Sequence, residues 1–389
     1  MSESQACIVG IGESAYARWG GIEGRSEFDL SVEAVQRACA DAGLAPRQID
    51  GFASYSDDRN EPSVMMMALG IDQLRHASMV WGGGGGGSCG ALAHAAAAVE
   101  SGRARYVAVF RGLCQGQHFR FGQFHAWSPH AAFTAPFGLL SPAQMFALLL
   151  RRHMHLYGTT SEQLAEVALS GRANAARNPR AVMRDRPLDL DGYMASRMIA
   201  DPLRLNDCCL ESDGAAAVIV TTAARARDLP ARPVRVLAAL QGSSGGWGSG
   251  MLGGHNMPDE IYASGNARRL AAELYGAAGV TAADIDVAQI YDAFTGTVLF
   301  ALEDYNFCGT GESGAFVADG NIRWPHGGLP ANTSGGNLSE AYIHGFNLLL
   351  EGVRQLRGTS TAQVDGAGLC LVTGGEAVTA TSAAILARD

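Results

Sequence analysis

The sequence predicts an α/β protein built from two copies of one strand–helix unit. The segment at residues 43–55, GLAPRQIDGFASY, returns at residues 279–291 as GVTAADIDVAQIY, so that Tyr55 corresponds to Tyr291. Each copy follows an apolar stretch and a stretch whose apolar residues have helical spacing. The repeat is too long for a solenoid, and strands that are apolar throughout indicate a sheet covered by helices on both faces.

In the first copy, residues 6–11 are apolar and predict a buried strand, and residues 28–42 predict a helix that ends at Gly43. A short turn with proline then leads into a strand that ends at Tyr55. Composition further along predicts an alanine-rich helix at residues 91–100 and strands at residues 106–110 and 213–221.

In the second copy the same order returns, because a predicted strand at residues 234–240 and a helix at residues 259–275 precede the repeated segment. After it we expect helices at residues 294–307 and 346–356, a strand with a tight turn at residues 369–376 and a last strand at residues 383–386. The linker is placed at residues 222–233, which divides the chain into halves at residues 1–225 and 226–389.

A long insertion at about residues 113–211 interrupts the first half. It is rich in Arg, His and aromatic side chains, many of them between residues 118 and 130. Ordered insertions of this length usually carry binding surface, but a simple cap or a dimer arm explains it equally well.

The composition excludes several classes of protein. The 389 residues are 47% hydrophobic with a net charge of −9 and no basic tract, so a large core is expected and nucleic acid is not. No apolar run reaches the roughly 18 residues of a membrane span, and the first residues lack the basic region of a signal peptide, so we expect a cytoplasmic location. The eight cysteines lack C-x-x-C spacing, so we expect reduced thiols and no zinc site. All 29 basic residues are Arg, so no lysine amine is available for a Schiff base.

Six consecutive glycines occupy residues 82–87, between an apolar strand pattern and the alanine-rich helix. Glycine costs about 0.5–1 kcal/mol relative to Ala in a regular element, so the run fits a sharp turn or the close approach of another group. The N–H groups and the positive dipole end of the helix start suit a developing negative charge. We favour a pocket floor over the alternative, a flexible linker.

Three further stretches can be compared with known families: Tyr291-Asp292-Ala293-Phe294, Ser334-Gly335-Gly336 to His344, and Thr373-Gly374-Gly375. Together with the glycine run, they resemble the thiolase superfamily, and within it the sterol-carrier and lipid-transfer type. Members have Asn-Glu-Ala-Phe or His-Asp-Cys-Phe at the first stretch, and Ser-Gly-Gly followed by Gly-His-Pro at the second. The resemblance spans the whole chain. It implies a five-layer αβαβα fold from two duplicated βαβαβαββ halves, paired as a homodimer.

Two thiolase residues are replaced in this alignment. The position of the nucleophilic Cys falls near Gly85, with Cys89 about one helical turn further on, and the position of the catalytic His coincides with Tyr342. These substitutions resemble the thiolase-like aldolases of bacterial steroid side-chain degradation. That resemblance implies retro-aldol cleavage of a β-hydroxyacyl-CoA to a ketone and a short acyl-CoA such as propionyl- or acetyl-CoA. It also implies a small zinc-ribbon/OB-fold partner protein in a heterotetramer, with CoA as part of the substrate and no other cofactor.

Retro-aldol cleavage removes the proton of the β-hydroxyl and protonates the resulting enolate. The absence of lysine excludes a Schiff base, and only the scattered histidines of the insertion could offer ligands for a metal. Acid/base side chains with N–H donors are the third solution, which the tyrosines suit. We favour Tyr291 as base and Tyr342 as acid, although the sequence leaves the assignment open. Asp292 and His344 are supporting candidates, with a helix-surface position the commoner case for such a histidine. The expected oxyanion or acyl-binding groups are Gly84, Gly85, Gly86 and Gly375.

Two other functions remain open from the sequence. The first is a thiolase or acyltransferase that uses Cys89 as its nucleophile, which requires a reactive thiolate. The second is a non-catalytic lipid-binding subunit that shapes a partner's site.

Overall fold

The computed structural model describes residues 3–56, 58–80, 84–117, 131–242, 259–378 and 380–389. Its main strands are β1 (Ala6–Glu13), β2 (Ala17–Arg18), β3 (Gly51–Tyr55), β4 (His76–Val80), β5 (Val107–Cys114), β8 (Ser212–Thr222), β9 (Val234–Gly242), β10 (Val287–Gln289), β11 (Leu369–Gly374) and β12 (Thr381–Arg388). They form one mixed sheet in the order β10-β11-β12-β9-β1-β8-β5-β3-β4, with β2 paired to β8. Strands β9 and β1 join the two halves of this sheet.

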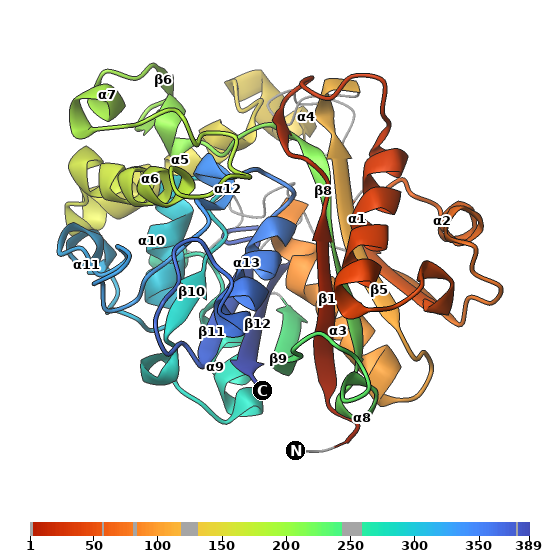
Figure 1. The fold of residues 1–389 in the computed structure, drawn as a ribbon. Coiled ribbons are helices and arrows are strands. Elements are labelled where there is room, and N and C mark those ends of the chain that lie inside the picture. Colours follow the sequence, from red (N-terminus) through yellow and green to blue (C-terminus); the bar gives the residue numbers. More distant parts are fainter. Residues whose placement is uncertain (1–2, 57, 81–83, 118–130, 243–258, 379) are drawn as a thin grey trace.

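Helices cover both halves of the sheet and fill the space between them. The helices are α1 (Glu27–Ala42), α2 (Pro62–Leu69), α3 (Ser88–Glu100), α9 (Arg268–Ala278), α10 (Thr295–Asp304) and α13 (Phe346–Arg357). Helix α1 packs outside on β1, β5 and β8, and α9 packs outside on β9 and β12. Helices α3 and α13 each contact strands of both halves and form the central layer (Figure 1). These are the five αβαβα layers that the resemblance implies.

The two halves follow one order of elements. The first runs β1, α1, β3, α2, β4, α3, β5, β8, and the second runs β9, α9, β10, α10, α13, β11, β12. In the second half, a parallel bridge between Ala288 and Ala331 stands where the first half has the parallel pair β3–β4. The predicted fold class is therefore confirmed, with the third strand of the second half reduced to a bridge. The limits 1–225 and 226–389 remain a prediction, and α8 (Ala223–Ala226) lies within the predicted linker.

Two predicted helix starts were wrong. The helix predicted from residue 259 begins only at Arg268, after a short 3-10 turn at Asp259–Ile261. Asn266 has a positive φ of 64°, and the Asp304 carboxylate accepts the Ala267 N–H (2.8 Å), so the chain turns before α9 can begin. Phe294 is extended rather than helical, and α10 begins at the next residue.

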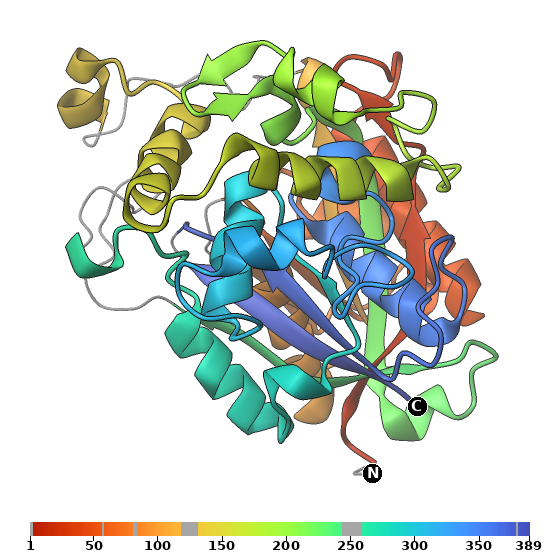
Figure 2. The same cartoon turned by 90° about the vertical axis from the view of Figure 1, so that its left-hand side faces the viewer.

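The insertion forms helices that lie over one end of the second half (Figures 1 and 2). Its described elements are α4 (Ala131–Thr134), α5 (Pro142–Tyr157), α6 (Ser161–Ala175), α7 (Leu190–Met194), β6 (Met198–Ala200) and β7 (Leu203–Arg204). Helix α6 packs on α10, α11 (Ser313–Ala318) and α12 (Gly336–Ser339). The buried His153 ring joins α5 to Glu303 of α10 (2.9 Å). The Arg, His and aromatic residues at 118–130, on which the expected binding surface, cap or dimer arm depends, lie outside the described residues.

Within the described ranges, no helix combines the length and apolar character that a membrane crossing requires.

Candidate active site

Two tyrosine hydroxyls meet at the centre of the molecule. Tyr291 follows β10, and Tyr342 lies on the loop between α12 and α13. Their hydroxyl oxygens are 2.6 Å apart, and the Gly85 N–H donates to the Tyr291 hydroxyl at 3.2 Å. Both side chains are buried, with exposed fractions of 3% and 6%. The structure thus brings together the two predicted catalytic tyrosines and the glycine turn.

Side-chain hydroxyls of two strands and of α10 fix the backbone of the loops that carry the two tyrosines. The Tyr291 N–H donates to the Thr373 hydroxyl of β11 at 3.0 Å, and the Thr297 hydroxyl donates to the Tyr291 carbonyl at 3.0 Å. The Tyr342 N–H donates to the Ser212 hydroxyl of β8 at 3.1 Å. The two phenols are therefore held from opposite halves of the fold.

Glycine is required at residue 85 because the Tyr291 ring occupies the space of a side chain. A Cβ atom there would lie 2.0 Å from Tyr291 Cε2, well inside any contact distance. The preceding Gly84 has a positive φ of 52°, and a Cβ on it would come within 3.5 Å of the Tyr291 hydroxyl. The position aligned with the thiolase nucleophile therefore has no room for a cysteine beside Tyr291.

Backbone contacts of the other two predicted glycines, Gly86 and Gly375, hold this turn in place. Gly375 has a φ of 73°, and a Cβ on it would lie 2.3 Å from the Gly86 Cα. A Cβ on Gly86 would lie 2.0 Å from the Ala380 carbonyl oxygen. The two turns therefore pack backbone on backbone beneath the tyrosine pair.

Both phenols are protonated at neutral pH. Burial raises the pKa of Tyr291, and burial raises the pKa of Tyr342 further. The hydrogen bond between them lowers the pKa of Tyr291 and raises that of Tyr342, so Tyr291 is the easier of the two to ionise. The Gly85 N–H can only donate, so a phenolate at Tyr291 would have two hydrogen-bond donors.

Asp292 supports the loop that leads to Tyr342. Its buried carboxylate accepts the N–H groups of Asn337 (2.8 Å) and Leu338 (3.2 Å). Burial raises the pKa of Asp292 to about 7 against these hydrogen bonds. Asp292 therefore holds the backbone of the loop that leads to Tyr342.

His344 is buried, so the expectation of a helix-surface histidine was wrong. It precedes α13 with a positive φ of 49°, and its ring packs edge-to-face on Tyr342 with centroids 5.4 Å apart. Arg111 of β5 donates from Nε to His344 Nδ1 at 3.1 Å, and the Tyr55 hydroxyl donates to the His344 carbonyl at 2.9 Å. Burial, together with the charge of Arg111, holds the pKa of His344 well below its usual value.

Three residues of this site were missed in the sequence. Tyr55 is the repeat counterpart of Tyr291, and Arg111 is a charge inside an apolar strand, so both left a signal. Cys209 left none. Its N–H donates to the Ala293 carbonyl at 2.9 Å, and its thiol is close enough to disfavour ionisation of both phenols.

Cys89 is held as a structural thiol. It is fully buried, its Sγ donates to the Val372 carbonyl at 3.5 Å, and its N–H donates to the Ser382 hydroxyl at 3.1 Å. Burial raises the pKa of this thiol to about 12, so almost none of it is thiolate at neutral pH.

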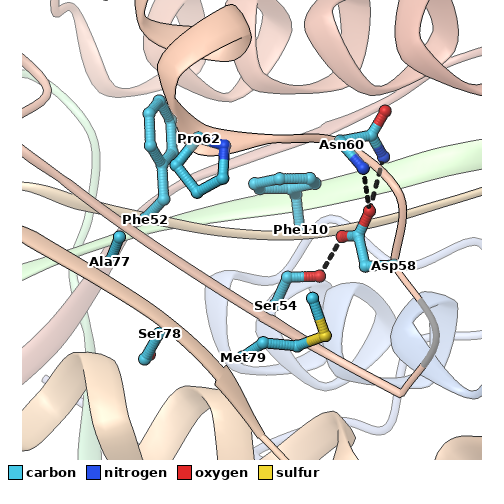
Figure 3. A pocket seen from close by; sticks show the side chains of 9 residues that line it. All are labelled: Phe52, Ser54, Asp58, Asn60, Pro62, Ala77, Ser78, Met79 and Phe110. Atoms are coloured by element: carbon cyan, nitrogen blue, oxygen red, sulfur yellow. Dashed lines mark hydrogen bonds between the residues drawn. The ribbon is translucent and has the colours of Figure 1, made fainter.

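A separate cavity of about 130 Å³ lies near the edge strand β4 (Figure 3). Phe52, Phe110 and Met79 line it, and the Asp58 carboxylate forms part of its wall. Ligand sites for larger molecules span about 300–1,000 Å³, so this cavity is too small to hold a drug-sized ligand.

Comparison with known proteins places the chain in a family. A family model described as Thiolase C-terminal domain-like matches residues 254–388. The 17-hydroxy-3-oxo-4-pregnene-20-carboxyl-CoA lyase of Mycobacterium tuberculosis is 43% identical over 387 residues, which cover 97% of this chain and 98% of that protein. The chain belongs to the thiolase superfamily, as one of its aldolases. A steroid side-chain-cleaving aldolase of Thermomonospora curvata is 41% identical to this aldolase, over 99% of this chain and 98% of that one.

Solved structures agree with the fold of the aldolase. One named Ltp2-ChsH2(DUF35) aldolase is 40% identical with a TM-score of 0.91, over 99% of this chain and 98% of that chain. An SCP2-thiolase like protein from Mycobacterium smegmatis shares the fold at 19% identity, with a TM-score of 0.71 over 100% of this chain and 78% of that one. The sterol carrier protein 2 of Bos taurus is 29% identical over 94% of this chain and 68% of that protein. The predicted sterol-carrier type of the thiolase superfamily is therefore confirmed.

Proposed function

We propose that this aldolase cleaves a β-hydroxyacyl-CoA whose acyl group is the side chain of a steroid. The products are a steroid ketone and a short acyl-CoA such as propionyl- or acetyl-CoA. The observation that supports it most is the 2.6 Å contact between the Tyr291 and Tyr342 hydroxyls above the glycine turn. The names of the two relatives with over 40% identity point to the same substrate class.

The proposed mechanism uses both phenols as a proton relay. Tyr291 accepts the proton of the β-hydroxyl as its own proton passes to Tyr342, and Tyr342 delivers its proton to the α-carbon. An electron pair on the alkoxide oxygen forms the C=O bond of the ketone, and the electron pair of the broken C–C bond forms the thioester enolate. The proton from Tyr342 then adds to the α-carbon of this enolate. Both phenols begin and end protonated, in agreement with their raised pKa values.

The glycine turn would stabilise the enolate oxygen. The Gly85 N–H contacts Tyr291 in this structure, so the donors that we propose for the enolate are the N–H groups of Gly84, Gly86 and Gly375. The turn also precedes α3, whose N-terminal dipole end favours negative charge.

The proposed reaction proceeds without an acyl-enzyme. Residue 85 has no space for a thiol beside Tyr291, Cys89 is buried with a raised pKa, and the sequence has no lysine. The side chains of this site can then contribute only proton transfer at the breaking bond.

We further propose that the aldolase works as a homodimer bound to a small zinc-ribbon/OB-fold partner in a heterotetramer. The solved structure named Ltp2-ChsH2(DUF35) aldolase, at 40% identity, supports a partner of the DUF35 type. Strand β4 lies at the edge of the sheet, and its Met79 is 56% exposed, which suits pairing with a second copy.

Product analysis tests the proposed reaction. The aldolase, copurified with its native partner, is incubated with a steroidal β-hydroxyacyl-CoA, and the products are identified by mass. Equimolar ketone and shortened acyl-CoA are expected. Transfer of an acyl group to free CoA would indicate a thiolase, and binding of the substrate without cleavage would indicate a lipid-binding subunit.

A further inference from the structure

A line of buried contacts runs from Tyr342 into the first half of the fold. The His344 ring packs on Tyr342, and its Nδ1 accepts the Nε–H of Arg111 at 3.1 Å. Arg111 Nη1 lies 4.0 Å from an Asp58 carboxylate oxygen. Ser54 and Asn60 donate to the same carboxylate (Figure 3). Arg111 is only 3% exposed and Asp58 7%, so solvent screens this line weakly.

The chemistry of Arg111 fixes the protonation state of His344. A guanidinium stays protonated and has donors only, so the imidazole nitrogen that faces it must be an acceptor. The proton of the neutral ring is then on Nε2. A proton on Nδ1 would place two N–H groups against each other at 3.1 Å.

The backbone keeps the ring in this place. His344 holds a left-handed φ of 49°, and its carbonyl accepts the Tyr55 hydroxyl at 2.9 Å. The charged and titratable groups that face the ring in the described residues are Arg111 on β5, Tyr55 on β3 and Tyr342 on its own loop. Asp58, which follows β3, faces Arg111 from the other side.

We propose that Arg111 is a positioning residue of the aldolase, which holds His344 as the neutral imidazole with its proton on Nε2 beside Tyr342. The proposal rests on the proposed function of Tyr342 as the acid. An imidazolium at His344 would stabilise a phenolate at Tyr342 rather than at Tyr291. That would reverse the direction of the proton relay, so a neutral His344 keeps Tyr291 as the base and Tyr342 as the acid.

The pH profile of turnover tests this role. The variant Arg111→Met removes the donor and the positive charge that oppose protonation of Nδ1, so the pKa of His344 rises, although burial still holds it below the ordinary histidine value of about 6.5. We expect its kcat to stay within about tenfold of wild type at pH 8 and to fall about tenfold per pH unit below about pH 6. Wild type and Arg111→Lys, whose ammonium can still donate, keep a flat profile over the same range. The exposed Arg269→Met on α9 is the matched control and leaves the profile unchanged.

Equal loss of kcat by Arg111→Met at every pH would mean a purely structural role and would overturn the proposal. A direct readout is the ¹⁵N spectrum of the histidines in the intact complex, with His344 assigned by its loss in His344→Gln. We expect the neutral Nε2–H form down to about pH 5.5 in wild type and a cation near pH 6 in Arg111→Met. A wild-type His344 that carries its proton on Nδ1, or that ionises near pH 6.5, contradicts the proposal. This spectrum does not depend on turnover, so it separates failure of this inference from failure of the proposed reaction.

Discussion

The Tyr291 ring occupies the position that a side chain on Gly85 would take, because a Cβ atom on residue 85 would lie 2.0 Å from Cε2 of the ring. The missing side chain lets the Gly85 N–H reach the Tyr291 hydroxyl at 3.2 Å. The phenol at residue 291 therefore requires the loss of the thiolase cysteine, since a cysteine at residue 85 does not fit beside Tyr291.

The first prediction concerns this contact. Gly85→Ala forces the Tyr291 ring to move, and we expect kcat to fall at least about 100-fold, as for loss of an acid or base, with about 1–3 kcal/mol lost from the free energy of unfolding. Gly276→Ala on α9, where a Cβ meets nothing within 4 Å, is the matched control and leaves kcat and stability unchanged or slightly raises stability. Steady-state cleavage rates and thermal melts measure both. Wild-type kcat in folded Gly85→Ala would show that the close approach is irrelevant to turnover.

The second prediction concerns Cys89. Because its thiol is buried and protonated, Cys89→Ala should keep kcat within about tenfold of wild type and cost about 1–2 kcal/mol of stability. Product formation and intact-protein mass during turnover provide the measurement. An acylated wild-type protein, together with a folded but inactive Cys89→Ala, would instead establish the acyltransferase mechanism.

The third prediction concerns stability against pH. Burial raises the pKa of Asp292 and of Glu340 to about 7 each, so the folded chain binds these protons more tightly than the unfolded chain does. Stability then decreases as pH rises from about 4 to about 7, by on the order of 4 kcal/mol per group. Denaturant unfolding at pH 5.5 and pH 8 should show this loss, and Asp292→Asn with Glu340→Gln should reduce it. A pH dependence that is identical in wild type and the double variant would rule out these two carboxyls as its source.

Much of the fold could be predicted because one strand–helix unit occurs twice in the sequence. The repeat that aligns Tyr55 with Tyr291 places both at the ends of buried strands, and the structure puts both beside the Tyr342 loop. The helix predicted from residue 259 failed because the chain turns at Asn266, and the bond from Ala267 N–H to the distant Asp304 that fixes this turn leaves no local pattern.

The candidate site could be predicted only in part. Tyr291 and Tyr342 stand at positions that the resemblance marks, so they were identified from sequence. The burial of His344 depends on Arg111, which is 233 residues away, and no spacing rule connects them. A charge inside the apolar strand at residues 107–114 was the one local sign that a buried partner was needed.

The central claim is that the two phenols move the proton, and Tyr→Phe substitution tests it most directly. Rates of ketone and acyl-CoA release are compared for Tyr291→Phe, Tyr342→Phe and the control Tyr305→Phe. Tyr305 is equally buried, and its hydroxyl has no hydrogen-bond partner among the residues described, so its loss should leave kcat unchanged. The account predicts that each of the first two variants folds normally and loses about 100- to 10,000-fold in kcat. Near-wild-type kcat in either one would contradict it.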